Sequence, residues 1–281
     1  MIDFNMALLD LRADEAYQAG HYRGATHIAW PELQTRLNEL PERPARLQLL
    51  GDEHALQAAS RFLAEKGYQI DAQIDLVEFE KDRQKQPGLV VSGKESRALW
   101  HPTPLLSEFI ESQLDLQPGL ALDLGCGGGR DSVYLAQTGW QVIAIDREQR
   151  VLKRAQQLAE STGQDLAIEW KPCCIETEGC LPAMQFDLIV MMRFLNRPAL
   201  LKMAKMLKPG GHLVIQTFVE GVERLGSPKN PNFILKKAEL KKTFGAFQVI
   251  VDRIDALKDG RPVVSFIAKK RGSDHVRNEL K

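Results

Sequence analysis

The chain alternates short apolar runs with longer amphipathic stretches, and this alternation predicts its secondary structure. Apolar runs bounded by glycine or proline are typical of buried strands, whereas apolar positions that recur at helical spacing are typical of helices. The first part of the chain has predicted strands at 7–11 and 46–50 and predicted helices at 12–20 and 52–67. Because strands alternate with helices, we expect a small α/β unit here.

The alternation resumes further along and continues almost to the end of the chain. It predicts helices at 104–114, 130–139, 148–163 and 198–211, and strands at 120–125, 141–146, 166–170, 186–192, 212–218, 247–255 and 262–270. Between the two regions, residues 82–104 are interrupted by charge, glycine and proline. We therefore predict an α/β protein with domains at 1–82 and 98–271, a linker at 83–97 and a tail at 272–281.

Composition narrows the classes of function. The 281 residues include 37 lysines and arginines and 37 aspartates and glutamates, so the net charge offers nucleic acid or an anionic membrane no general attraction. No apolar run approaches the roughly 20 residues that span a bilayer, and the N-terminus is acidic where a secretory signal would be basic. The four cysteines lack the spacing of a disulfide framework. We expect a cytoplasmic protein with free thiols and no membrane or DNA partner.

The stretch LALDLGCGGGRDSVYLAQTGWQVIAID, residues 120–146, runs from a strand through a glycine loop into a helix and a second strand. Such a turn binds nucleotide-like ligands in doubly wound sheets. The dinucleotide fingerprint fails, because Arg130 stands where its last glycine belongs. Asp123 would repel a pyrophosphate but suits a cationic amine, and Asp146 stands where an acid accepts hydrogen bonds from a ribose. S-adenosylmethionine has the amine and the ribose and lacks phosphate.

Residues 100–270 resemble the class I S-adenosylmethionine-dependent methyltransferases. LDLGCGGGRDSVYLA followed by VIAID is similar to the first two motifs of that superfamily, and GGRDSVYLA resembles its tellurite-resistance and thiopurine-type branch. The resemblance implies a Rossmann-like domain with a mostly parallel, seven-stranded sheet and S-adenosyl-L-methionine as cofactor. It places the loop of Asp123, Gly125, Cys126 and Gly127 at the methionine end of the cofactor, Asp146 at the ribose and Arg147 at the adenine edge.

The adenine site departs from the family pattern. After LAIEWKP the family commonly places an aspartate, whereas this chain has CCIETEG, with Cys173 or Cys174 at that place and Glu176 nearby. Which group recognises the adenine amino group stays open, with a backbone carbonyl as an alternative. Cys174, Ile175 and Met191 complete the predicted cofactor residues. The vicinal cysteines and Cys180 lack a fourth ligand nearby in sequence, so we expect no metal and favour packed free thiols over a redox pair.

Candidate residues for the methyl acceptor follow the strand at 186–192. Arg193 and Arg197 lie on the loop that borders the transferable methyl group in the superfamily, although a solvated helix start is an equal alternative for two arginines beside a proline. His101 is the nearest candidate for a general base. These three residues are the predicted catalytic residues. The arginines suit a small acceptor that is soft or anionic, such as a thiol or a metalloid oxyanion, which needs no general base.

The N-terminal region resembles the rhodanese domain. LLDLRADEAYQAGHYRGATHIAWPEL carries the recurring Asp–Arg pair and the Gly-His-x-x-Gly-Ala pattern of that family. An active rhodanese takes sulfur onto a cysteine in the loop after its next strand, where this chain has Gly51, and no cysteine precedes Cys126. The resemblance therefore implies a non-catalytic domain that regulates, docks or dimerises.

Two other functions stay open at this point. The first is an RNA methyltransferase that uses its N-terminal domain to dock on transfer RNA, which the neutral net charge does not favour. The second is a non-catalytic module that binds S-adenosylmethionine. A small-molecule substrate is the expected partner, and a homodimer is left open.

Overall fold

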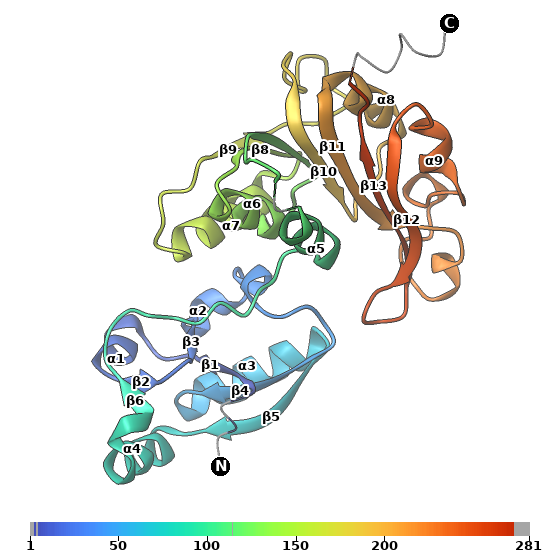
Figure 1. Ribbon diagram of the computed structural model, residues 1–281. Coiled ribbons are helices and arrows are strands. Elements are labelled where there is room, and N and C mark those ends of the chain that lie inside the picture. Colours follow the sequence, from blue (N-terminus) through green and yellow to red (C-terminus); the bar gives the residue numbers. More distant parts are fainter. Residues whose placement is uncertain (1–2, 4, 114, 273–281) are drawn as a thin grey trace, which may run out of the picture. The chain divides into compact units, whose positions relative to one another are not determined.

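The computed structural model describes residues 3, 5–113 and 115–272 and divides the chain into two compact units, Met1–His101 and Pro102–Lys281 (Figure 1). Both units are α/β. Residue 114, at the end of a predicted helix, and residues 273–281 of the predicted tail lie outside the described residues. Within the described parts of the chain, no helix has the length and apolar character needed to cross a membrane.

The first unit is built on a parallel sheet with the strand order β3-β1-β4-β5. Its strands are β1 (Ala7–Asp10), β3 (Thr26–His27), β4 (Ala45–Leu50) and β5 (Tyr68–Ile74), and its helices are α1 (Asp14–Ala19), α2 (Trp30–Leu33), α3 (Glu53–Glu65) and α4 (Leu76–Lys85). The sequence pattern missed β5, because only Tyr68 and Ile74 at its two ends are fully buried. Such an edge strand lacks the regular pattern of apolar residues from which a strand is predicted.

The predicted linker is largely a packed part of the first unit. Residues 83–85 end α4, and β6 (Val90–Val91) pairs antiparallel with β2 (His21–Tyr22). Further along, the carbonyl of Arg97 accepts a hydrogen bond from the Thr26 hydroxyl at 2.5 Å. Apolar packing explains the difference, since Leu89 and Val90 contact the cluster that contains Tyr17, Tyr22 and Phe79.

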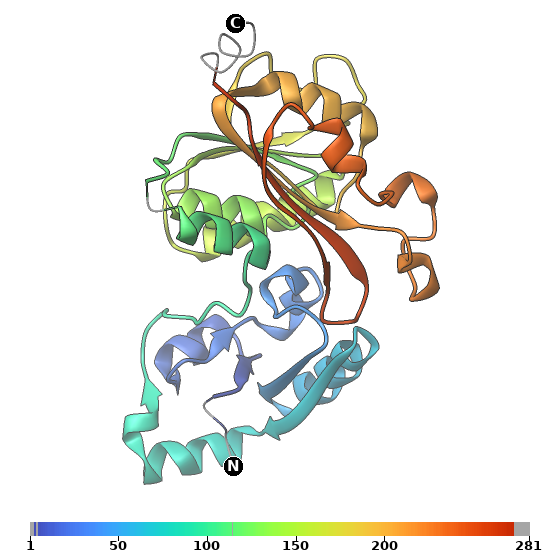
Figure 2. The same ribbon diagram turned by 45° about the vertical axis from the view of Figure 1, so that its right-hand side comes forward.

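The second unit is built on a seven-stranded sheet with the order β12-β13-β11-β10-β7-β8-β9. The strands are β7 (Leu120–Leu124), β8 (Gln141–Asp146), β9 (Ile168–Pro172), β10 (Phe186–Met192), β11 (Leu207–Phe218), β12 (Gln248–Ala256) and β13 (Pro262–Lys269). Strand β13 is antiparallel to both neighbours, so the sheet is mixed, although most of its strands run in one direction. Figure 2 shows β12 and β13 as a long twisted pair.

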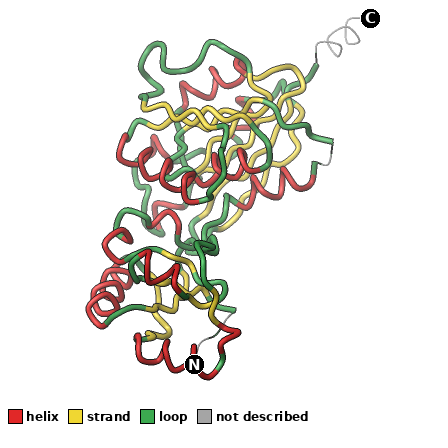
Figure 3. The backbone as a smooth tube through the Cα atoms, turned by 90° about the vertical axis from the view of Figure 1, so that its left-hand side faces the viewer, coloured by secondary structure: helices red, strands yellow, loops and turns green. Residues whose placement is uncertain are grey.

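Helices cover both faces of this sheet (Figure 3). They are α5 (Pro104–Ser112), α6 (Arg130–Gln137), α7 (Gln149–Ser161), α8 (Arg197–Met206) and α9 (Glu239–Thr243). Side chains of α5 and α6 share one buried cluster with Ala121 and Val190 of the sheet, whereas side chains of α8 and α9 share another with Leu122 and Ile189. Because successive strand residues point to opposite faces, the two clusters form two layers of core.

Strand order reverses at β7, which lies between β8 and β10. Connections leave the two sides of such a reversal in opposite directions and open a crevice at the carboxyl ends of the strands. The predicted helix at 198–211 ends earlier than expected, because β11 begins at Leu207. Gly211 lies so close to the Asp187 carbonyl that a Cβ would approach it to 3.0 Å, which fixes this segment against β10.

Candidate functional site

The loop after β7 passes so close to its neighbours that two glycines are required. Gly125 has a φ of 72°, and a Cβ there would lie 2.6 Å from Cγ of Phe194. Gly129 has a φ of 81°, and its Cβ would lie 2.6 Å from the Cβ of Ala155 on α7. The loop is anchored to β8 through the amide of Gly125, which donates to the Ile145 carbonyl at 2.8 Å. The loop therefore places backbone atoms without side chains at the edge of the crevice.

Asp146 ends β8 and holds the glycine loop. Its carboxylate accepts from the Gly127 amide at 3.0 Å through Oδ2 and from the Glu148 amide at 2.9 Å through Oδ1. A carboxylate offers about four acceptor positions, so the two backbone bonds leave capacity for further donors. The arrangement fixes the orientation of Asp146 and suits a ribose diol, which presents two hydroxyl donors.

Asp123 lies beneath the loop instead of facing the crevice. Its side chain is buried, and Oδ2 accepts from the Ser132 hydroxyl at 2.5 Å. Burial, together with the negative charges of Asp131 and Asp146, raises the pKa of Asp123 to about 8. Asp131 accepts from the amide and hydroxyl of Thr103 at 2.6 and 2.9 Å. Asp123 thus supports the loop from below.

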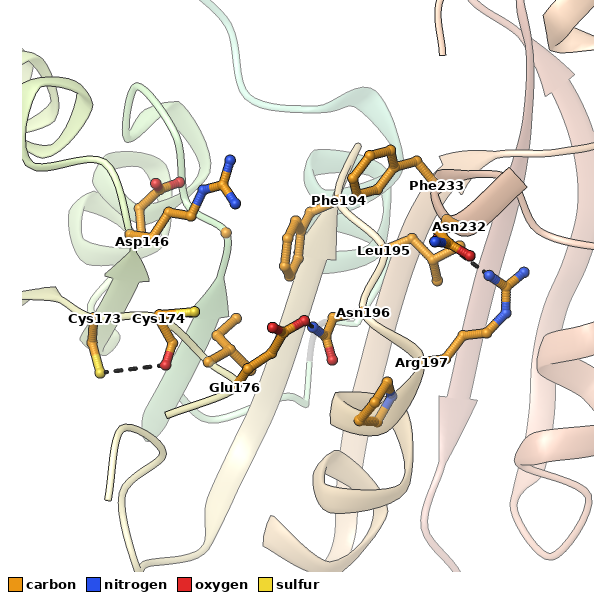
Figure 4. A pocket seen from close by; sticks show the side chains of 14 residues that line it. Asp146, Cys173, Cys174, Glu176, Phe194, Leu195, Asn196, Arg197, Asn232 and Phe233 are labelled. Atoms are coloured by element: carbon orange, nitrogen blue, oxygen red, sulfur yellow. Dashed lines mark hydrogen bonds between the residues drawn. The ribbon is translucent and has the colours of Figure 1, made fainter. Parts of the chain in front are cut away.

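A cavity of about 600 Å³ opens at the carboxyl ends of β7, β8 and β9 (Figure 4). Its volume falls within the roughly 300–1,000 Å³ of typical small-molecule sites. The lining residues are Gly125, Asp146, Arg147, Cys173, Cys174, Ile175, Glu176, Phe194, Leu195, Asn196, Arg197, Pro198, Asn232 and Phe233. In Figure 4, Phe194 projects between Asp146 on the β8 side and Phe233 on the loop side.

Five of the predicted cofactor residues line this cavity: Gly125, Asp146, Arg147, Cys174 and Ile175. The other four, Asp123, Cys126, Gly127 and Met191, do not line it. Met191 is fully buried in the core of β10, and Cys126 packs against the cluster on the α5–α6 face. A role for these four residues in cofactor binding therefore stays a prediction.

Sequence reasoning missed the aromatic wall formed by Phe194 and Phe233. Phe194 directly follows the polar Arg193 at the end of a strand, and Phe233 is an apolar residue in a long polar loop with 49% of its surface exposed. An aromatic residue within a long polar loop is a sequence signal that could have identified Phe233, because binding residues often lie on such loops.

Two of the cysteines that we expected to be free are joined. Cys173 and Cys180 form a disulfide with a Cα–Cα distance of 5.8 Å, whereas Cys126 and Cys174 are free. The prediction of free thiols is therefore wrong for the first pair, because the turn through Gly179, with a φ of 76°, returns Cys180 to Cys173. Burial raises the pKa of the Cys126 thiol. No group of three or more metal-ligating side chains occurs among the described residues.

The two predicted catalytic arginines line different cavities. Arg197 lines the large cavity, but its guanidinium is bound to Glu239. Arg193 lines a smaller, neighbouring cavity. His101 is the exposed last residue of the first unit and lines neither of these two cavities.

The fold and the large cavity together define a doubly wound α/β protein with a nucleoside-type site. The site lies at the reversal of strand order, has an acid at the end of the second strand and a loop of close-packed glycines, and fits S-adenosylmethionine in size and donor set.

Comparison with known proteins identifies the class of protein to which the second unit is similar. The family described as a methyltransferase domain matches residues 121–211, which run from β7 through the glycine loop and Asp146 into β11. The second unit therefore carries an S-adenosylmethionine-dependent methyltransferase domain, and S-adenosylmethionine is its cofactor.

Individual relatives extend the match. The uncharacterized protein UNK4.09 of Schizosaccharomyces pombe is 26% identical in an alignment of 314 positions, which covers 93% of each chain and therefore reaches both units. A ubiquinone biosynthesis O-methyltransferase of Leptothrix cholodnii is 34% identical over 129 residues, 44% of this chain and 54% of that protein. The chain thus spans about half the length of that curated O-methyltransferase. Among solved structures, TehB from Haemophilus influenzae is 22% identical with a TM-score of 0.48, over 59% of this chain and 62% of that one.

Proposed function

We propose that the protein transfers a methyl group from S-adenosylmethionine to a small acceptor that is soft or anionic, such as a thiol or a metalloid oxyanion. The observation that carries the proposal is the large cavity itself, which has Asp146 at one side and the aromatic wall of Phe194 and Phe233 at the other. When bound, S-adenosylmethionine would supply an electrophilic methyl carbon to the lone pair of the acceptor.

The protein's contribution is alignment and exclusion of water. Asp146, with its orientation fixed by two backbone amides, holds the ribose, and Ile175, Phe194 and Leu195 supply the apolar lining. Glu176 accepts from the Asn196 amide group at 3.1 Å, which positions Asn196 at the entrance to α8. A thiolate or an oxyanion already carries its lone pair, so the acceptors proposed here require no general base.

The first unit is proposed to be a rhodanese-like accessory domain without catalysis. Its motif residues support the fold: Arg12 forms an ion pair with Asp10 at 2.6 Å and donates to the Gly20 carbonyl at 2.8 Å. Where an active rhodanese has its cysteine, Gly51 is followed by Asp52, which caps α3 by accepting from the Ala55 amide at 2.8 Å. The residues that carry the resemblance are thus occupied in structural contacts.

Titration calorimetry tests the cofactor part of the proposal. S-adenosylhomocysteine is expected to bind, and NADH is not. Asp146→Asn should weaken binding of S-adenosylhomocysteine by about 10-fold or more, since hydrogen bonds to a charged group contribute roughly 1.5–3 kcal/mol. Asp165→Asn is the matched control, because Asp165 is an exposed acid outside the cavity. Binding of NADH in place of S-adenosylhomocysteine would refute the assignment.

Turnover against a panel of a thiol, a metalloid oxyanion and transfer RNA tests the acceptor. Methylation of the thiol or the oxyanion is the expected result. Methylation of transfer RNA alone would replace the proposal with the RNA alternative, and tight cofactor binding without any methylated acceptor would favour the non-catalytic module. The large cavity carries both signs of charge, with Asp146 and Glu176 against Arg147 and Arg197, so its lining does not favour RNA.

A further inference from the structure

The disulfide between Cys173 and Cys180 closes a short segment that forms part of the cofactor cavity. Cys173, Cys174, Ile175 and Glu176 line the cavity, and Cys180 lies seven positions after Cys173 in the sequence. In Figure 4, Cys173 and Cys174 lie on the same side of the cavity as Asp146. The disulfide therefore constrains a stretch of chain that a nucleoside in this cavity would contact.

Few buried side chains hold the closed segment in place. Ile175 and Cys180 are buried, whereas Cys174 and residues 176–179 are exposed. Two turn hydrogen bonds lie within the segment, from the Thr177 amide to the Cys174 carbonyl at 2.8 Å and from the Cys180 amide to the Thr177 carbonyl at 3.2 Å. Because a segment with few buried contacts opens easily, a covalent closure contributes much of its order.

Glu176 connects the closed segment to the start of α8. Its carboxylate accepts from the side-chain amide of Asn196 at 3.1 Å, and Oδ1 of Asn196 accepts from the Ala199 amide at 2.9 Å, which caps the helix. Asn196 also lines the cavity. A loosened segment would therefore alter the lining of the cavity both after β9 and before α8.

The two halves of the disulfide differ in exposure. Cys180 is 2% exposed and belongs to the core cluster that contains Leu122 and Ile189, whereas Cys173 is partly buried and lines the cavity. An external thiolate would therefore approach the disulfide at Cys173 from the cavity. A nucleoside bound there would cover the same approach.

We propose that this disulfide is a redox switch for the cofactor site, which binds the nucleoside tightly when the disulfide is closed and more weakly after a dithiol has reduced it. The proposal rests on the proposed function and adds regulation of the same site. Reduction loosens the segment that lines the cavity, and a bound nucleoside in turn protects the disulfide.

The reduction is a thiol–disulfide exchange in two steps. A thiolate of the dithiol attacks Sγ of Cys173, the sulfur–sulfur bond breaks, and its electron pair leaves on Sγ of Cys180, which takes up a proton. The second thiol of the dithiol loses its proton, and its sulfur displaces Sγ of Cys173, which is protonated in turn. The protein thus gains two electrons and two protons, and the dithiol becomes a disulfide.

Calorimetry in two redox states is the first test. S-adenosylhomocysteine is titrated into the full chain in oxidised and in reduced dithiothreitol. Its affinity should fall about 5-fold or more on reduction, because the opened segment must be ordered again on binding, and it should return on reoxidation. Circular dichroism should show that the reduced protein stays folded. Equal affinities in the two states, or unfolding on reduction, would overturn the proposal.

Two variants separate the disulfide from other effects of the reductant. The double variant Cys173→Ser, Cys180→Ser should bind S-adenosylhomocysteine with the affinity of the reduced natural protein, whether or not reductant is present. Glu178→Gln is the matched control, because Glu178 is exposed within the same closed segment and does not line the cavity. It should keep the full response to reductant. A response that persists in the double variant would refute the role of this disulfide.

A redox titration is the second test, and it needs no variant. The protein is equilibrated with graded ratios of reduced to oxidised dithiothreitol, and the thiols at 173 and 180 are counted by alkylation and mass spectrometry. Saturating S-adenosylhomocysteine should raise the ratio that gives half reduction by the same factor by which reduction lowers its affinity, because binding and reduction form one thermodynamic cycle. A midpoint ratio that the nucleoside does not change would contradict the switch.

The two proposals fail differently. If S-adenosylhomocysteine binds in neither redox state, the proposed function fails, and the switch fails with it. If it binds equally well in both states and leaves the midpoint ratio unchanged, the proposed function stands and only the switch fails.

Discussion

Arg197 and Glu239 form a bidentate ion pair, with Nε 2.6 Å from Oε1 and Nη2 3.0 Å from Oε2. The same guanidinium donates to the carbonyls of Asn232 at 3.2 Å and Ile234 at 2.8 Å. It therefore ties the long loop after β11 to the start of α8, and the loop in turn supplies Phe233 to both cavities. The structure thus engages Arg197 in these contacts, and its predicted catalytic role stays a prediction.

Breaking this pair should destabilise the second unit. Arg197→Gln and Glu239→Gln are each expected to lower the free energy of unfolding by about 1–2 kcal/mol, since partly exposed charged hydrogen bonds contribute at this level. Urea unfolding of the two single variants and the double variant measures the coupling. The double variant should lose clearly less than the sum of the two single losses. Strictly additive losses would mean that the pair contributes no coupling.

The glycine loop predicts a steric effect at Gly125. Gly125→Ala places a Cβ against the Phe194 ring in addition to straining a left-handed backbone, whereas Gly163→Ala, at a φ of 66° with open space around it, meets only the strain. Gly125→Ala should therefore lose about 1–3 kcal/mol more stability than Gly163→Ala, the usual cost of overpacking. Thermal unfolding of both variants measures the difference. Adding Phe194→Ala should recover part of the loss at 125, and a failure to recover it would contradict the close contact.

The raised pKa of Asp123 predicts a pH dependence of stability. The folded protein keeps this carboxyl protonated up to about pH 8, whereas the unfolded chain ionises it near pH 4. Between these values the folded state binds the extra proton, so this group's contribution to folding becomes less favourable as pH rises. Asp123→Asn should remove that contribution, and its stability relative to the natural protein should increase from pH 5 to pH 8. Denaturant unfolding across this range measures it.

Two controls accompany the Asp123 experiment. Ser132→Ala removes a hydrogen bond that lowers the pKa of Asp123, so the window of declining stability should extend to higher pH. Asp165→Asn, at an exposed acid, should give a stability difference that stays nearly constant over the same range. A constant difference for Asp123→Asn as well would show that the carboxyl ionises at an ordinary pKa.

The cysteine pairing predicts a count of thiols. The denatured protein should titrate two thiols, Cys126 and Cys174, without reductant and all four cysteines after reduction. In the folded protein only the exposed Cys174 should react quickly, because burial raises the pKa of Cys126 and leaves it as a thiol. Reduction should lower the free energy of unfolding by about 2 kcal/mol, as expected for a short closed loop. Four thiols without reductant would contradict the pairing.

Local patterns predicted the central strands of the second unit and the placement of Asp146. Strands β7, β8 and β10 are continuous apolar runs, and a glycine loop followed by a helix is a short-range signal. The sequence did not predict contacts between distant segments. Arg197 meets Glu239 from 42 positions away, and the pairing of β2 with β6 converts a charged, proline-containing segment into part of the first unit. Such contacts depend on tertiary packing, which local sequence patterns do not predict.

The reversal of strand order divides the cavity lining between two stretches of the chain. Asp146 ends β8, and Arg147, Cys174 and Ile175 follow β8 and β9, whereas Phe194, Leu195 and Phe233 come after β10 and line both cavities. A substitution in the later stretch is therefore expected to alter the nucleoside site together with the smaller cavity, so the two halves of the sheet should vary in concert.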